Sequence, residues 1–392
     1  MPQKKDLWGC CTLIGLICCT LECNLACTYC YEGNGLKKEM PSVSYINQKF
    51  ADAMEDIIRF IDELVAHNGE SLTEIIWHGG EPLLIYIDLL EKVMKDQKQK
   101  KHRVRWAIQT NGTLLTRTVC EVFKAYHVSV GVSIDGQKTH HDRFRVMKNG
   151  SGTYDLIVEN IRRAQEMGIV CGALITITDA NVHDLNEIYH SFSEKNLNFN
   201  FNALFPTPNK EESMSLNTDR FAKAICDLFD LWAEDESSNI KITPFEQIIE
   251  GLLKPKRGVP ACHWSRDCSR SFVAMDCEGD LYPCEHWVGN KAYCFGSIKE
   301  GLENALKKDM FFIQRTQLLE NSECAHCPIF PLCYGGCPWN GRVLTGDHNR
   351  KDASICAGRK IIIEHIYRYM RRNWKQNPFG SMSLEAYLMQ NG

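Results

Sequence analysis

Short apolar runs alternate with longer helical patterns over the first half of the chain, and this alternation limits the possible folds more than any other feature. The apolar runs are continuous, which is typical of strands in a parallel sheet covered by helices. Repeated β–α units imply right-handed crossovers, and therefore an α/β barrel or an open doubly wound sheet. The predicted strands are Leu13–Leu21, Thr73–Trp77, Val104–Gln109, Ser129–Ile134, Val170–Thr176 and Leu197–Phe201.

Helical patterns fill the intervals between the predicted strands. Six strands fit a partial barrel better than the eight of a complete one. We therefore predict an α/β fold in which residues 10–205 form a partial (β/α)6 barrel. The helices predicted for this region are Ser44–Asn68, Ile85–Gln97, Arg117–Tyr126, Tyr154–Met167 and Asp184–Glu194.

Beyond residue 205 the alternation stops, and three further regions are predicted. Residues 206–260 form a helical linker region, with helices at Thr218–Glu234 and Phe245–Leu253. Residues 261–360 are dense in cysteine and form a small domain. Residues 361–392 hold a basic and aromatic helix, Ile361–Trp374, and a tail.

Charge and composition argue against several classes of function. The net charge of -4 on 392 residues gives no reason to expect nucleic acid or an anionic membrane as a partner. The apolar run Leu7–Leu21 is too short to span a bilayer and lacks a small-residue cleavage site. Without a secretory signal, the 20 cysteines are expected to stay reduced in the cytoplasm and to bind metal.

Three of these cysteines, Cys23, Cys27 and Cys30, lie within eight residues just after the first predicted strand. Functional residues of a barrel gather at the carboxyl ends of its strands, and polar sequences end the next three strands at this same edge. Three thiolates are one fewer than a [4Fe–4S] cluster usually takes from protein. The trio therefore predicts a cluster with one iron left to bind another molecule.

The trio and the turn Gly79-Gly80-Glu81-Pro82 together resemble the radical S-adenosylmethionine (radical SAM) enzymes. In that family the open iron binds the amino and carboxylate groups of SAM. The resemblance implies that the turn receives the ammonium, with Glu81 fixing the turn, and that Tyr29 packs beside the cluster and adenine. It also suggests Ser133 and Arg145 as contacts to the ribose or carboxylate. An ordinary strand-end serine and a surface arginine are the alternative explanations.

A second set of cysteines resembles the SPASM domain that follows some radical SAM barrels. Its eight thiols are enough for two auxiliary [4Fe–4S] clusters, which makes three clusters in all. A zinc ribbon is the alternative, but it does not explain the spacings outside the Cys-x2-Cys pair. By resemblance, Cys262, Cys268, Cys284 and Cys337 hold the first auxiliary cluster, and Cys324, Cys327, Cys333 and Cys356 hold the second.

The resemblance implies an oxidation carried out by a radical. In the family, the three-cysteine cluster reduces SAM to methionine and a 5′-deoxyadenosyl radical, which takes a hydrogen atom from the substrate. The auxiliary clusters are expected to accept the second electron. The spacing resembles that of anaerobic sulfatase maturases, which make formylglycine from Cys or Ser and have an aspartate base at the position of Glu285. Glu285 is the expected base, His286 is a second candidate, and His78 is expected to be packed in the core.

The maturases of ribosomally made peptides, which install thioether or carbon–carbon crosslinks, are the other resemblance. Glu285 and the residues around the Gly-Gly-Glu-Pro turn favour the peptide maturases, and we place crosslinking slightly ahead of formylglycine formation. Only 22 residues precede Cys23, which leaves no room there for a peptide-recognition domain. An electron-transfer protein without SAM chemistry is the distant alternative. The expected partners are a peptide or protein substrate and a reductant of the flavodoxin or ferredoxin type.

Overall fold

The computed structural model describes residues 12–31, 40–204, 216–264, 271–309, 311–373 and 379–391. Contacts group the chain into two units. The first, called the strand unit here, consists of Cys10–Leu174 and Ser269–Met310. The second, called the helical unit, takes in Ile175–Cys268 and Phe311–Gly392. The division into four regions made from the sequence follows other boundaries and stays a prediction.

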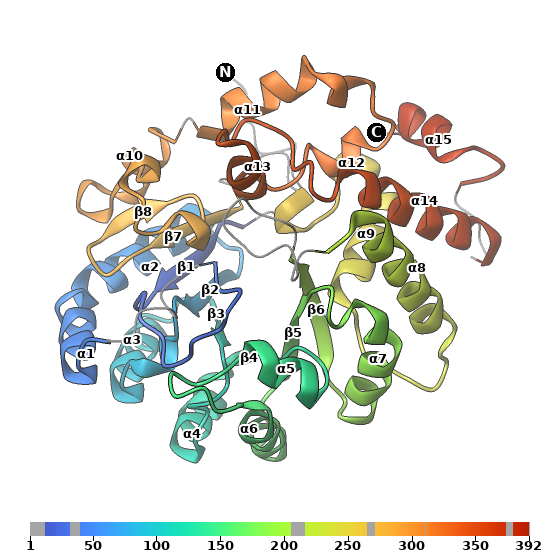
Figure 1. Ribbon diagram of the computed structural model, residues 1–392. Coiled ribbons are helices and arrows are strands. Elements are labelled where there is room, and N and C mark those ends of the chain that lie inside the picture. The colour runs from blue at the N-terminus through green and yellow to red at the C-terminus, as the bar shows by residue number, and fades with distance from the viewer. Residues whose placement is uncertain are drawn as a thin grey trace. The chain divides into compact units, whose positions relative to one another are not determined.

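A parallel sheet is the centre of the strand unit (Figure 1). Along its strands fully buried side chains alternate with half-buried ones, so that Trp77, Ile108 and Val132 lie on the core side. The continuous apolar runs therefore give a sheet that is covered on both faces, and the side chains on one face are more deeply buried than those on the other. The strands pair in the order β1 (Ile14–Cys18), β2 (Thr73–His78), β3 (Val104–Thr110), β4 (Ser129–Ser133) and β5 (Cys171–Ile177).

The helices of the strand unit follow the predicted order, with two differences. The predicted helix Ser44–Asn68 is two helices, α1 (Val43–Asp52) and α2 (Met54–Asn68), which meet at Ala53. A short helix after β4, α5 (Lys138–Phe144), was not predicted. The remaining helices confirm the prediction within two residues at each end and are α3 (Ile87–Gln99), α4 (Arg117–Tyr126) and α6 (Tyr154–Glu166).

A hairpin from the cysteine-rich region extends this sheet on the far side of β1. Strand β7 (Phe272–Met275) pairs with β1 in parallel, and β8 (Asp280–Tyr282) and β9 (Gly296–Ser297) follow in antiparallel pairing. Gly279 turns the chain between β7 and β8 with a φ of +81°. The sequence did not predict these strands. Their pairing carries the segment around Cys284 to the edge of the barrel strands.

The helical unit is built on long amphipathic helices. The predicted helix Thr218–Glu234 is confirmed as α8, which Asn217 caps by accepting from the N–H groups of Asp219 and Arg220. Helix α14 (Cys356–Asn373) begins at Cys356 rather than at Ile361. It packs against α8 at Gly358, where a Cβ would lie 3.1 Å from Thr218 Cγ2. Strand β6 (Asn198–Ala203) lies next to the last part of β5. Helix α10 (Leu302–Leu306) belongs to the strand unit. The other helices of the helical unit are α7 (Leu185–Glu194), α9 (Thr243–Leu253), α11 (Phe311–Glu320), α12 (Phe330–Cys333), α13 (Pro338–Thr345) and α15 (Leu384–Asn391).

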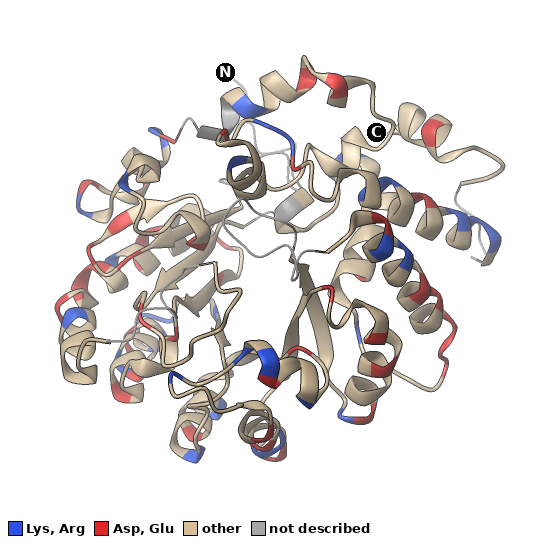
Figure 2. Ribbon diagram, viewed as in Figure 1, with Lys and Arg blue, Asp and Glu red and all other residues tan. Residues whose placement is uncertain are grey.

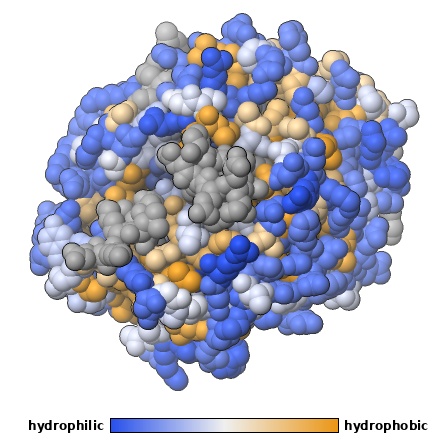
Figure 3. Space-filling view, viewed as in Figure 1, coloured by the Kyte–Doolittle hydropathy of each residue, from blue (hydrophilic) through white to orange (hydrophobic). Residues whose placement is uncertain are grey.

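The outer helices carry charges of both signs. Figure 2 shows Lys and Arg interspersed with Asp and Glu along α8 and α14. Over these helices, the face drawn in Figure 3 is mostly hydrophilic with scattered apolar residues. Among the helices that the structure describes, none is both long and apolar enough to cross a membrane.

Candidate active site

The loop that carries Cys23, Cys27 and Cys30 follows β1 and is held by backbone pairing. The N–H of Ala26 donates to the carbonyl of Val146 at 2.8 Å, and the N–H of Thr28 donates to the carbonyl of Phe144 at 3.1 Å. An isolated bridge joins Leu25 to Met147. The segment just after α5 therefore fixes the positions of the three thiols.

The three thiols lie close enough to affect one another's ionisation. Burial raises the pKa of Cys23 to about 12, and the charges of Glu81, Cys27 and Cys30 act in the same direction. The N–H of Leu25 donates to the Sγ of Cys23 at 3.4 Å, and the amide of Asn111 approaches that sulfur at 3.7 Å. Neighbouring half-buried thiolates need a shared cation, so this donor set fits an iron–sulfur cluster.

Gly79 and Gly80 bring the turn after β2 against the start of the cysteine loop. A Cβ on Gly79, whose φ is +125°, would lie 2.2 Å from the carbonyl oxygen of Thr20. A Cβ on Gly80 would lie 2.3 Å from the carbonyl oxygen of Glu22. The N–H of Gly80 donates to Thr20 O at 2.8 Å, and that of Glu81 donates to Glu22 O at 2.9 Å. The glycines thus allow contact between two backbones, and their expected contact with SAM stays a prediction.

Glu81 fixes the turn, as predicted, and also braces the end of β3. Its buried carboxylate accepts from the N–H of Leu83 at 2.9 Å, from the hydroxyl of Thr110 at 2.7 Å and from the N–H of Asn111 at 2.7 Å. Burial raises the pKa of Glu81 to about 7, although these bonds favour the charged form. Pro82 opens a 3-10 turn (Pro82–Leu84) directly behind it.

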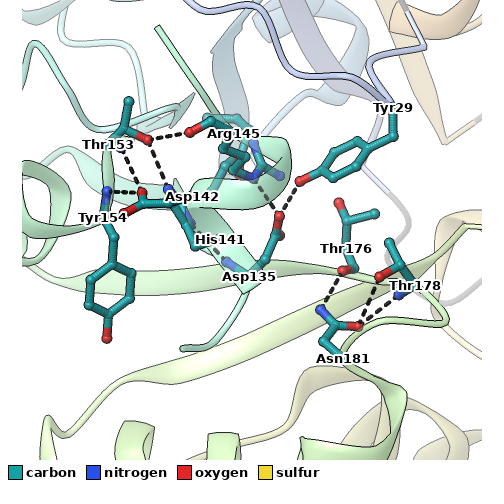
Figure 4. A network of polar contacts seen from close by, with 12 residues as sticks. Tyr29, Asp135, His141, Asp142, Arg145, Thr153, Tyr154, Thr176, Thr178 and Asn181 are labelled. Carbon is teal, nitrogen blue, oxygen red and sulfur yellow. Dashed lines mark hydrogen bonds and ion pairs between the residues drawn. The ribbon is translucent and has the colours of Figure 1, made fainter. Parts of the chain in front are cut away.

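Tyr29, Asp135 and Arg145 form a buried network beside the cysteine loop (Figure 4). Tyr29 donates its hydroxyl to Asp135, and Arg145 Nε donates to the same carboxylate at 2.9 Å. The guanidinium of Arg145 also lies 5.3 Å from the centre of the Tyr29 ring. Arg145 is therefore buried and ion-paired, so the alternative of a surface arginine is wrong. Neither Asp135 nor this network was predicted from the sequence.

His141 supports the network from the other side. Its Nδ1 accepts from the N–H of Asp135 at 3.3 Å, and its Nε2 lies 2.9 Å from the hydroxyl of Thr153. Because Thr153 donates that hydroxyl to the carbonyl of Arg145, Nε2 of His141 carries the proton and the ring is neutral. Burial lowers the pKa of His141 to about 4, which agrees with this arrangement. Ser133 lies at the end of β4, where its hydroxyl accepts from Gln109 at 3.1 Å.

Glu285 lies in a cluster with two histidines. It follows Cys284 after β8, and one carboxylate oxygen lies 3.3 Å from Nδ1 of His286. Burial acts to raise the pKa of Glu285, but His286 and His78 outweigh it and lower the pKa to about 2. The ring of His286 stacks on Tyr31 at 4.4 Å. His78 ends β2, where its Nδ1 accepts from the N–H of Gly79 at 2.8 Å and burial lowers its pKa.

Four of the predicted auxiliary ligands lie together in the helical unit. Cys324, Cys327, Cys333 and Cys356 line one cavity, together with Lys351, Asp352 and apolar residues. A common cavity lined by four thiols fits a fully ligated [4Fe–4S] cluster. The other predicted set stays a prediction. Cys284 belongs to the strand unit, Cys262 and Cys337 belong to the helical unit, and Cys268 lies outside the described residues.

Comparisons with known proteins find similar chains and a matching family model. Residues 17–192 match the model of the Radical SAM superfamily. The chain is 28% identical over 397 residues to a serine-type anaerobic sulfatase-maturating enzyme of Bacteroides thetaiotaomicron, covering 94% of this chain and 91% of the relative. It is 27% identical to a cysteine-type enzyme of Clostridium perfringens over 80% of this chain and 85% of the relative. A structure of anSMEcpe with bound AdoMet and Cp18Cys peptide superposes with a TM-score of 0.76 at 23% identity, covering 92% of this chain and 98% of that one.

Proposed function

This chain belongs to the radical SAM superfamily, and we propose that it oxidises a side chain of a peptide or protein substrate. The observation that carries the proposal is the joint placement of the three-cysteine loop and the Gly79–Pro82 turn at one end of the parallel sheet. A [4Fe–4S] cluster and SAM, when bound there, supply the 5′-deoxyadenosyl radical that takes a hydrogen atom from the substrate.

The chain's own residues would bind and orient SAM. Cys23, Cys27 and Cys30 hold the cluster in this proposal, and the carbonyls of the Gly79–Pro82 turn accept from the ammonium of SAM. Ser133 and Arg145 are the proposed partners of its ribose or carboxylate, and Tyr29 flanks the adenine. The buried pairing of Arg145 with Asp135 supports this role, because it holds a cation 5.3 Å from the Tyr29 ring, beside the cysteine loop.

Glu285 is the proposed base that removes a proton as the substrate is oxidised. Its pKa of about 2 keeps the carboxylate ionised at neutral pH, as a base must be. His286, at 3.3 Å, pairs with this carboxylate and favours its ionised form.

The second electron of the oxidation needs an acceptor within the protein. We assign this role to two auxiliary [4Fe–4S] clusters, one held by Cys262, Cys268, Cys284 and Cys337, the other by Cys324, Cys327, Cys333 and Cys356. The cavity shared by the four thiols of the second set supports that assignment. A flavodoxin or ferredoxin would then supply the electron that starts each turnover.

Two products fit this chemistry, and each has an observation in its favour. The curated relatives named as sulfatase-maturating enzymes favour formylglycine made from Cys or Ser. A glutamate at position 285, one methylene longer than the aspartate base expected of the sulfatase maturases, favours a crosslink. A crosslink, or formylglycine made from Ser, is a loss of two hydrogen atoms. Formylglycine made from Cys also requires hydrolysis of the oxidised side chain, in which water supplies the oxygen and sulfide leaves.

Anaerobic reconstitution with iron, sulfide, SAM and a reductant tests the proposal. We expect 5′-deoxyadenosine to form, and a candidate peptide to lose the mass of two hydrogen atoms in the same reaction, with sulfur also replaced by oxygen where a Cys becomes formylglycine. An aldehyde on a Cys or Ser identifies formylglycine, whereas a lost thiol or a closed ring identifies a crosslink. A fully loaded protein that forms no 5′-deoxyadenosine would reject the enzymatic function.

A further inference from the structure

A buried arginine, Arg359, lies beside the four-thiol cavity of the helical unit. Its side chain is 3% exposed and lies near the start of α14, three residues after Cys356. Its Nη1 donates to the Sγ of Cys333 at 3.8 Å. Its Nε is also buried and meets no hydrogen-bond acceptor among the residues that the structure describes. The guanidinium therefore has donor capacity beside a predicted cluster ligand.

The surrounding residues hold this guanidinium in place. Asp352 forms a buried ion pair with Nη2 of Arg359 at 3.3 Å, and the ring of Trp264 lies 5.2 Å from the guanidinium carbon. Gly336, with a φ of +78°, leaves the space that the guanidinium needs, because a Cβ there would lie 2.0 Å from Nη1. So many constraints on one side chain indicate a specific position, not a chance contact.

The charged side chains around the cavity differ in whether they contact a cysteine sulfur. Lys351 and Asp352 both line it, and Lys351 is paired with the exposed Glu323 at 2.6 Å. Arg359, in contrast, donates directly to the sulfur of Cys333.

We propose that Arg359 raises the reduction potential of the cluster held by Cys324, Cys327, Cys333 and Cys356. This inference rests on the proposed function, which assigns a cluster to those thiols. Hydrogen bonds to sulfur and nearby charge are the main protein factors that set the potential of such a cluster. Reduction adds negative charge, so a buried cation that donates to a ligand sulfur stabilises the reduced form. Asp352 offsets part of this effect and holds the guanidinium in place.

Redox titration followed by electron paramagnetic resonance tests the inference on full-length protein. The background carries Cys23→Ala, Cys27→Ala and Cys30→Ala, so that the signals come from auxiliary sites. Arg359→Gln should lower the midpoint potential of one signal, and Arg359→Lys should lower it less. Asp352→Asn should raise it, because the arginine loses its counter-charge. Arg368→Gln, an exposed arginine of the same helix paired with Glu364, should leave it unchanged.

The opposite shifts in midpoint potential expected for Arg359→Gln and Asp352→Asn distinguish an effect of Arg359 on the cluster potential from a merely structural role. If Arg359→Gln fails to retain iron, the Asp352→Asn variant still decides, since an unchanged or lowered potential there contradicts the inference. Wild-type iron content with unchanged potentials in both variants overturns the inference and leaves the proposed function intact. If replacing the four cysteines by alanine removes no iron, the proposed auxiliary cluster is absent, and the inference is overturned with it.

Discussion

Buried polar side chains around the cysteine loop hold residues that are far apart in the chain. Tyr29 and Asp135 are 106 residues apart, and Asn24 and Thr113 are 89 residues apart, yet each pair is hydrogen-bonded. A single sequence could predict the thiols and the turn, because their chemistry depends on local spacing. It could not predict the pairing of Asp135 with Tyr29 and Arg145, because these partners are brought together only by the fold.

Glu285→Gln tests the role of the carboxylate at the level of one residue. SAM cleavage should persist, because Glu285 is not among the residues proposed to hold SAM. The yield of peptide product should fall by roughly 10²-fold or more if the carboxylate is the general base. Glu278→Gln, an exposed carboxylate of the same hairpin that pairs with Lys49, is the control. Equal product yields in the two variants would rule out the base.

His141 should make the stability of the protein depend on pH. Its pKa is lowered from 6.5 to about 4 in the folded protein, so between these values the unfolded chain binds a proton that the folded chain does not. Stability should therefore fall as the pH drops from about 6.5 toward 4, by no more than about 3 kcal/mol from this residue.

Denaturant unfolding at pH 7 and pH 5 measures this dependence. His141→Asn should be less stable at pH 7 and should show a smaller loss between the two pH values. His140→Asn, on the same helix, serves as a control and should keep the wild-type pH dependence. A wild-type pH dependence in the His141 variant would assign the effect to other groups.

At the level of elements, the sequence predicted regular structure well where periodicity was strong. The helices Arg117–Tyr126 and Thr218–Glu234 begin and end where they were predicted. Helix α5 was missed because its seven residues carry too short a pattern, and β7 to β9 were missed because they are brief strands with turn residues between them. The early start of α14 placed Cys356 on a helix rather than in a loop.

Gly79→Ala tests the contact between the Gly-Gly-Glu-Pro turn and the cysteine loop. The new Cβ would lie 2.2 Å from the Thr20 carbonyl oxygen, so the turn must move. We expect a loss of stability of about 2–4 kcal/mol, beyond the roughly 1–2 kcal/mol of a left-handed backbone alone. Gly168→Ala supplies that reference, since its φ is +83° and no atom lies within 4 Å of the new Cβ.

Denaturant unfolding and iron content together measure the result. The Gly79 variant should be the less stable of the two and should hold less iron on reconstitution. Equal losses in stability with full iron loading in both would show that the contact with Thr20 does not position the loop.

At the level of the whole molecule, the chain order of the elements was predictable and the pairing of β7 with β1 was not. The cysteine-rich region was expected to form one small domain. That division stays a prediction. Contacts place its hairpin, β7 to β9, in the strand unit and Phe311–Gly392 in the helical unit. Pairing of β7 with β1 depends on contacts between residues far apart in sequence, which composition and periodicity do not report. The identity of the substrate also depends on surfaces that no motif describes.

The transfer of a hydrogen atom from the substrate to the 5′-deoxyadenosyl radical tests the central claim most directly. A candidate target peptide would be made with deuterium at the Cβ of its reactive Cys or Ser and incubated with the reconstituted protein. The mass of the 5′-deoxyadenosine that forms would then be measured by mass spectrometry. We predict that the 5′-deoxyadenosine gains one deuterium as the peptide loses two hydrogen atoms. Product formed with no deuterium in 5′-deoxyadenosine, from peptides labelled at each candidate carbon, would contradict hydrogen abstraction by this enzyme.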